Sequence, residues 1–229
     1  METMILVESL DDAPKTSTPS LQRLGRHVRH DPRSWAYPAP MASELKTVRH
    51  KRHVPIWNQG SLGACTGYAG VGCIGSGPFT HKGNAKQAVA VYSEATRLDT
   101  FAGAYPPKDT GSSGLAVMKA LRKRKLIKGY AHAFGIDHAF RALMLRPGIT
   151  GFAWRTGCDR PNAAGVVRYS GPMRGGHEVV LAGLDLVKKL VWFDNSWGAS
   201  WGLRGSFAMT IADYTRALAD HGDVTFPVL

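Results

Sequence analysis

The sequence has little acid and little cysteine. It carries 17 Asp and Glu against 29 Lys and Arg, a formal charge of +12 over 229 residues, and only three cysteines. Three cysteines cannot all pair with one another, and Cys65 and Cys73 are too few and too isolated for a zinc cluster. We therefore exclude a small disulfide-stabilised scaffold and expect no metal site.

Long apolar runs are also missing. No stretch approaches the roughly 20 uninterrupted apolar residues of a membrane span. The opening segment METMILVESLDDAPK lacks the charged start and the apolar core of a secretion signal. Unpaired cysteines are typical of a reducing compartment. We expect a cytoplasmic protein without a membrane partner, with non-classical release or packaging into a virion left open.

Hydrophobic residues make up 44% of the chain, enough to form a sizeable core. Residues 1–53 differ from the rest, because no helical or strand period crosses them. They contain five prolines: Pro14, Pro19, Pro32, Pro38 and Pro40. We predict that 1–53 form an extended N-terminal arm and that 54–229 form the folded domain.

Helical spacing precedes strand patterns along this domain. Residues 65–74, 89–98 and 115–125 have apolar residues at helical intervals, and the serines before the third can cap it. Four short runs rich in Val, Leu, Phe and Trp are typical of antiparallel strands: 149–154, 178–186, 189–194 and 205–211. The order predicts an α+β fold with a helical lobe over about 54–140 and a β lobe over about 141–229.

Three segments carry residues suited to thiol chemistry. Cys65 follows a glycine-bearing turn at the start of a predicted helix, where the helix dipole lowers a thiol's pKa. His177 opens a predicted strand and is a candidate partner for that thiol. Asn195 can fix the imidazole's orientation, and the Gln59 amide, six residues before the thiol, can donate to an oxyanion.

These segments resemble those of the papain-like cysteine peptidases. The family's nucleophile block, Gln-Gly-x-x-Gly-x-Cys, matches the segment from Gln59 to Cys65. Its second block is a histidine opening a strand, and its third, Asn-Ser-Trp-Gly-x-x-Trp-Gly, matches the segment from Asn195 to Gly202. The resemblance covers about 54–214, and the short ending is similar to the bacterial and bacteriophage branch of the family.

The resemblance implies a role for each matched residue. Cys65 is then the nucleophile, His177 the general base and acid, Asn195 its orienting partner, and Gln59 part of the oxyanion hole. Trp197 would shield the bond between Asn195 and His177 from water. The implied architecture is a helical lobe packed on an antiparallel, β-barrel-like lobe, with a substrate cleft between them. Five small residues are candidates for lining that cleft: Gly111, Ser112, Ser113, Gly175 and Gly176.

The sequence also departs from the family pattern. Leu62 stands where many secreted members have a cysteine, and Thr66 stands where an aromatic residue usually follows the nucleophile. Glu178 replaces a small residue after His177; strand alternation predicts that it points away from the cleft, in a structural or exposed role. The family's long helical propeptide is missing, so the arm 1–53 is a candidate for masking the cleft.

The implied activity is that of a cysteine endopeptidase. It would hydrolyse polypeptides through a thiolate–imidazolium pair of Cys65 and His177 and a thioester acyl-enzyme, and it needs no metal or organic cofactor. Two alternatives remain open. One is a catalytically silent, papain-fold binding or virion-associated protein. The other is an amidase that acts on cell-wall peptides.

The excess positive charge is partly local. Residues 119–128 hold six bases and no acid: Lys119, Arg122, Lys123, Arg124, Lys125 and Lys128. This is either a solvated helix face or a docking surface for an acidic partner. No aromatic residues alternate with these charges, so we predict no sequence-specific binding of nucleic acid.

Overall fold

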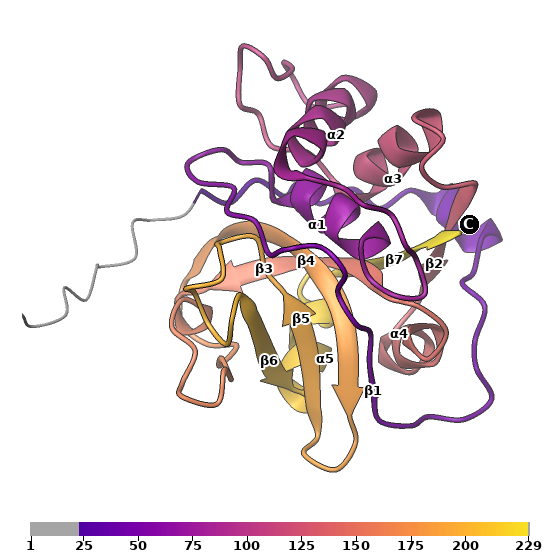
Figure 1. Ribbon diagram of the computed structural model, residues 1–229, viewed down its shortest axis with the longest axis vertical. Helices are drawn as coiled ribbons and strands as arrows, with labels where there is room; N and C mark the ends of the chain where they lie inside the picture. The colour runs from indigo at the N-terminus through magenta and orange to yellow at the C-terminus, as the bar shows by residue number, and fades with distance from the viewer. Residues whose placement is uncertain (1–22, 229) are drawn as a thin grey trace, which may run out of the picture.

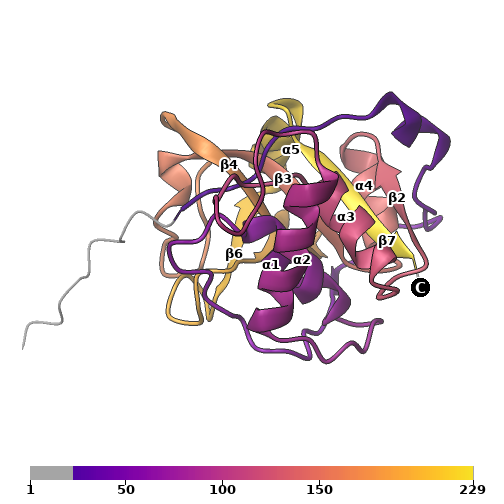
Figure 2. The same ribbon diagram turned by 90° about the horizontal axis from the view of Figure 1, so that it is seen from above.

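The computed structural model describes residues 23–228, in which a layer of helices packs on an open antiparallel sheet (Figure 1). Five α-helices are present in this range: α1 (Cys65–Ile74), α2 (Ala85–Leu98), α3 (Gly114–Lys123), α4 (Ile136–Leu143) and α5 (Ile211–Ala219). Two short 3-10 helices, η1 (Pro32–Ala36) and η2 (Thr156–Cys158), complete the helical elements. Both views show α1, α2 and α3 grouped together (Figures 1 and 2). The α+β prediction is confirmed.

The first three helices form for the reasons that the sequence suggests. Every residue of α1 is buried, so this glycine-containing helix is held by packing on all sides. Asn84 caps α2, because its side chain accepts a hydrogen bond from the Gln87 amide. Ser113 caps α3 in the same way through the Ala116 amide. The predicted capping of the third helix by a serine is therefore confirmed.

The sheet has the strand order β2-β7-β3-β4-β5-β6, and β1 pairs with β4 beside this path. Its strands are β1 (Val48–Arg49), β2 (Gly129–Ala133), β3 (Gly148–Arg155), β4 (Met173–Asp185), β5 (Leu190–Asp194), β6 (Ser206–Thr210) and β7 (Asp223–Val228). The four predicted strands correspond to β3, β4, β5 and β6. The sheet does not close, so it is an open sheet rather than a barrel.

The two faces of the sheet belong to different cores. Ile149, Val180 and Ala182 pack with residues of α1, α2 and α3. Phe152 and Val179 lie in the second core, together with residues of α4 and α5. Successive residues of a strand thus point into different lobes.

The change from helical layer to sheet layer falls between α3 and β2. Strand β2 pairs with β7 along its length, and α4 packs in the core on the sheet's far face. The helical layer therefore ends near residue 123 in the structure. The described part of the arm, 23–53, includes η1 and β1 and lies along the domain (Figure 1). Between residues 23 and 228, no helix has the length and apolar content needed to cross a membrane.

Candidate active site

His177 and Asn195 meet inside the sheet. His177 lies in β4 and Asn195 directly follows β5, the neighbouring strand. The imidazole Nε2 donates to the Asn195 Oδ1, at 2.8 Å, and that oxygen also accepts the Ser196 backbone amide at 2.8 Å. Because Oδ1 is an acceptor in both contacts, Nε2 carries the proton in a neutral ring. The other ring nitrogen, Nδ1, is buried without a hydrogen-bond partner among the described residues.

Aromatic rings enclose this pair. The Trp197 ring stacks on the His177 ring with centroids 4.8 Å apart and planes at 29°. Trp154 meets His177 edge to face at 4.9 Å. The Trp197 side chain, 4% exposed, excludes water from the imidazole. Its role as a shield for the bond between Asn195 and His177 remains a prediction.

Cys65 is the first residue of α1, but its thiol does not have a lowered pKa. Burial raises the pKa of the Cys65 thiol to about 12, and hydrogen bonds from the backbone of Glu178, Gly25 and Thr66 act in the opposite direction. The helix dipole predicted to lower this pKa is thus outweighed by the exclusion of water. The thiol is neutral in this structure, and it lies beside the backbone of the residue that follows His177.

Burial also disfavours the charged form of the His177 imidazole. It lowers the pKa of His177 to about 4, although the bond to Asn195 raises it, and the Arg174 charge lowers it further. Neither member of the pair is charged at neutral pH. A neutral thiol and a neutral imidazole are the unreactive forms of such a pair.

Gln59 has partners on both sides of its amide. Its Nε2 donates to the Leu62 carbonyl at 2.8 Å and to the Arg23 carbonyl at 3.0 Å. Its Oε1 accepts the Ser196 hydroxyl at 2.6 Å. The carbonyl of Arg23 belongs to the arm, so an arm backbone oxygen occupies a donor that was predicted to bind an oxyanion.

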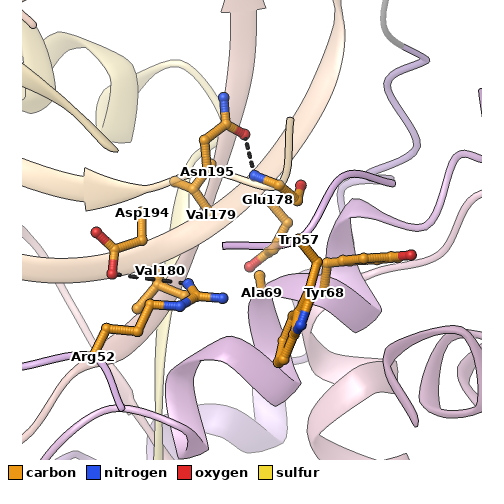
Figure 3. A pocket seen from close by; sticks show the side chains of 10 residues that line it. Arg52, Trp57, Tyr68, Ala69, Glu178, Val179, Val180, Asp194 and Asn195 are labelled. Atoms are coloured by element: carbon orange, nitrogen blue, oxygen red, sulfur yellow. Dashed lines mark hydrogen bonds and ion pairs between the residues drawn. The ribbon is translucent and has the colours of Figure 1, made fainter. Parts of the chain in front are cut away.

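Two further contacts hold the segments of the site together. The Gln59 backbone amide donates to the Ser196 carbonyl at 2.8 Å, which ties the loop before α1 to the segment after β5. The carboxylate of Asp194 pairs with Arg49 at 2.6 Å and lies 3.8 Å from Arg52. Arg52 and Asp194 line a small pocket that Asn195 also borders (Figure 3). Asp194 therefore fixes the end of β5 from which Asn195 projects.

The arm crosses the site as an added length of backbone. The Arg26 amide donates to the Gly176 carbonyl at 3.0 Å, on the sheet side. On the helical side, Ser112 donates to the Gly25 carbonyl at 2.8 Å and accepts from the His27 amide at 2.8 Å. Figure 1 shows this indigo segment crossing the molecule before η1.

The predicted cleft residues lie on both sides of the arm. Ser112 and Gly176 bond to it directly, and Gly111 and Gly175 approach it at Gly25 and Leu24. Ser113 is buried and caps α3 instead.

A glycine in the arm permits this close approach. A Cβ on Gly25 would lie 1.9 Å from the Gly63 carbonyl oxygen, in the loop that leads to Cys65. No other residue type fits here without moving that loop. The arm is also anchored beside this point, because Arg23 pairs with Asp109 at 3.0 Å. The site is thus covered by the chain's own residues.

The solved structures that are similar to this chain include a cysteine protease and two procathepsins. Xylellain, a cysteine protease from Xylella fastidiosa, is similar over 90% of this chain and 96% of its own, with a TM-score of 0.70 and 17% identity. Procathepsin B S9 from Trypanosoma congolense covers 90% and 85% with a TM-score of 0.64 and 12% identity. Procathepsin L2 from Tenebrio molitor covers 91% and 78%, with a TM-score of 0.58 and 16% identity. No protein-family model and no curated protein matches the sequence.

The chain has the papain-like fold. In this fold, hydrogen bonds through Ser196 link the His177–Asn195 pair to Gln59, and the Cys65 thiol lies beside the backbone of Glu178. The other two cysteines, Cys73 and Cys158, are buried and unpaired. Among residues 23–228, no group of three or more His, Cys, Asp or Glu side chains is arranged to hold a metal ion.

Sequence reasoning missed one charged cluster in this papain-like fold. Arg26, Glu178 and Asp223 meet beside Cys65, and the first two are almost completely buried. Glu178 points to the opposite side of β4 from His177, as alternation predicts, but that side is a buried pocket. The unusual acid after the histidine was a visible signal, whereas its partners come from the arm and from β7.

Proposed function

We propose that this chain is a cysteine endopeptidase that hydrolyses peptide bonds through Cys65 and His177. The observation that carries the proposal is the bond from His177 Nε2 to Asn195. It leaves Nδ1 of the ring as the unpaired base. Cys65 begins α1, and its thiol bonds to the backbone of Glu178, the residue after His177. This position supports the pairing of Cys65 as nucleophile with His177 as base.

The chemistry proceeds in two acyl transfers. His177 Nδ1 takes the Cys65 proton, and Sγ attacks the carbonyl carbon of the scissile amide. The carbon–nitrogen bond then breaks, and His177 returns the proton to the leaving amine. Water next attacks the thioester, giving its proton to His177, and the carbon–sulfur bond breaks to release the acid and the thiol.

The developing oxyanion needs donors in place before the reaction begins. The Gln59 Nε2 and the Cys65 backbone amide supply two. Gln59 already binds a backbone carbonyl, that of Arg23, in the covered site. A substrate carbonyl is the same chemical group, so its binding here requires only that the arm leaves.

The arm acts as a short pro-segment in this proposal. It makes backbone hydrogen bonds to both sides of the cleft and removes water from Cys65 and His177, which keeps both groups neutral. Two of the similar structures are procathepsins by name, which fits a covered form. The sequence predicts the arm over 1–53; residues 1–22 lie outside the described part.

Xylellain matches nearly the whole of this chain, which supports assignment to the short bacterial type; a bacteriophage source remains a prediction. The three unpaired cysteines support the cytoplasm as the compartment. The basic face 119–128 remains a proposed surface for an acidic partner. Two of its charges, on Lys123 and Arg124, already pair with Glu94.

Turnover of peptides with a thiol-specific control tests the proposal. Wild-type protein should cleave unfolded polypeptide, and Cys65→Ala should not, while Cys73→Ala should retain activity because its buried thiol lies outside the site. Peptide cleavage that survives Cys65→Ala would overturn the assignment. Folded protein without turnover or labelling by an epoxide would favour the silent binding protein, and cleavage of purified peptidoglycan alone would favour the amidase.

A further inference from the structure

A buried acidic pocket beside Cys65 holds the side chain of Arg26. The guanidinium Nη2 lies 3.1 Å from the Asp223 carboxylate and donates to the His221 carbonyl at 2.9 Å. Its Nε lies 3.7 Å from the Glu178 carboxylate. The side chains of Arg26 and Glu178 are each 1% exposed, whereas that of Asp223 is 18% exposed, so two of the three charged groups are shielded from solvent.

The register of three neighbouring strands builds this pocket. Gly151 in β3 stands opposite Glu178 in β4 and opposite Asp223 in β7. The two acids thus flank a glycine at one level of the sheet. A Cβ on Gly151 would lie 2.2 Å from Nε of Arg26, so the missing side chain is the space that the guanidinium fills. A second glycine, Gly114 at the start of α3, makes room for Glu178 in the same way.

Arg26 does not provide hydrogen bonds for all the polar atoms of this pocket. Both carboxylate oxygens of Glu178 are buried without a hydrogen-bond partner among the described residues, and so is Nε of Arg26. Burying a carboxyl group costs free energy unless it is hydrogen-bonded. The arm therefore leaves unused hydrogen-bonding capacity at the bottom of the pocket.

The pocket has a defined position relative to the nucleophile. Gly25, which precedes Arg26, bonds through its backbone to the Cys65 thiol. A substrate that followed the path of the arm would place the residue next to its contact with Cys65 at the position of Arg26. The side chain of that residue would then have the access to Glu178 and Asp223 that Arg26 has.

We propose that this pocket, formed by Glu178, Gly151 and Asp223, selects peptide substrates with an arginine or lysine next to the residue at Cys65. The inference rests on the proposed peptidase function and names its substrate class. The arm's arginine then occupies the position of the substrate's basic side chain. A neutral side chain would leave two acids beside the cleft without a cationic partner, one of them buried.

A cleavage profile tests this selection directly. Full-length protein and its Arg26→Ala variant are given a peptide library in which each position is scanned with arginine, lysine, citrulline and leucine. Citrulline has the shape of arginine without its charge. At one position, next to the residue at Cys65, we expect replacement of arginine by citrulline to lower kcat/KM roughly 10- to 100-fold. The reason is that charge-assisted hydrogen bonds are lost.

Substitutions in the pocket test whether its residues cause the preference for arginine over citrulline. Asp223→Asn and Glu178→Gln should each reduce the ratio of kcat/KM for the arginine peptide to kcat/KM for the citrulline peptide. Asp137→Asn is the matched control, since its 65% exposed side chain pairs with Arg141 on the surface of α4. An unchanged ratio in both pocket variants would overturn the inference.

A binding measurement separates this inference from the activity itself. Arg26→Ala leaves the pocket without its cation, and propylguanidinium should raise the melting temperature of this variant. Propylurea, its neutral counterpart, should not, nor should propylguanidinium act on Arg26→Ala carrying Asp223→Asn. Arg26→Met is the substitute if Arg26→Ala does not fold.

The outcomes are distinct. Peptide cleavage without preference for a base, together with no effect of propylguanidinium, overturns the pocket and leaves the peptidase standing. Binding of propylguanidinium with no cleavage of any peptide supports a basic-side-chain pocket and overturns the peptidase.

Discussion

The His177 Nε2 lies 2.8 Å from the Asn195 Oδ1, and the Trp197 ring stacks on the same imidazole. The bond determines which nitrogen carries the proton, and the stacking keeps the ring in place. Orientation of His177 is therefore shared between a hydrogen bond and an aromatic contact, whereas the proton transfer depends on the imidazole alone.

This division predicts unequal losses from two substitutions. His177→Ala removes the base and should lower kcat by roughly 10³-fold or more. Asn195→Ala keeps the stacking on Trp197, and its loss should be at least about tenfold smaller. Steady-state kinetics on one peptide gives both numbers, and equal losses would contradict an orienting role for Asn195.

Loosening the arm should expose the thiol. Arg26→Ala leaves the buried Glu178 carboxylate and the partly exposed Asp223 carboxylate without their cation, and this loss costs up to about 3 kcal/mol. If this cost destabilises the state in which the arm covers the site, the open state becomes more populated. Alkylation of Cys65 by iodoacetamide should then accelerate by up to roughly 100-fold. Arg29→Ala is the control, because this arginine lies in the same arm and is exposed. Identical rates for wild type and Arg26→Ala would mean that Arg26 does not hold the arm closed.

The pKa of the His177 imidazole should also change when the arm opens. In the covered protein, burial holds the pKa of His177 at about 4, so its ring should remain neutral down to that pH. In Arg26→Ala, water reaches the ring and the pKa should rise toward its ordinary value of 6.5. Ring resonances followed by NMR titration, assigned with His177→Gln, measure both values. A normal pKa in the wild-type protein would contradict the buried, neutral state.

The lowered pKa of His177 also determines how the contribution of this residue to the free energy of unfolding changes with pH. The folded pKa of His177 lies below the unfolded value, so its contribution is present above pH 6.5 and is lost as the pH falls toward 4. It amounts to about 3 kcal/mol at most. Burial raises the pKa of Glu178, and the Asp223 charge raises it further, so Glu178 acts in the opposite direction. The difference in unfolding free energy between wild type and His177→Gln isolates the histidine and should shrink on acidification; a constant difference would contradict this.

A substitution far from the cleft checks the account of the helical layer. Asn84→Ala removes the hydrogen bond from the Gln87 amide, 2.9 Å long, that caps α2. We expect a loss of about 1 kcal/mol in the free energy of unfolding, measured in urea, with kcat/KM unchanged. Lys86→Ala, two residues along on the same helix, is the control. A fall in activity at full stability would show that α2 affects the site more than its cap explains.

Much of the site was predictable because its signals are local. The glycine-bearing turn before Cys65 and the apolar residues after it predict α1 with the bounds that the structure has. The spacing from Gln59 to Cys65 and the motif at Asn195 identify the remaining parts. Each of these signals lies within a few residues of sequence.

The rest depends on contacts between distant segments. The thiol's raised pKa results from burial in the folded chain, which no helix-dipole argument contains. Strands β2 and β7 pair with one another across almost a hundred residues, and neither has a strong pattern of its own. The pocket around Arg26 needs three strands in register and an arginine from the arm. Only the tertiary structure brings such partners together.

The proposed mechanism requires a covalent intermediate on Cys65. Full-length protein, mixed briefly with a peptide or its activated ester and quenched in acid, should show a mass increase equal to the acyl half of the substrate. Digestion should locate that mass on Cys65, and Cys65→Ala should show neither adduct nor product. Product formation without an adduct on Cys65, or by Cys65→Ala, would contradict the account.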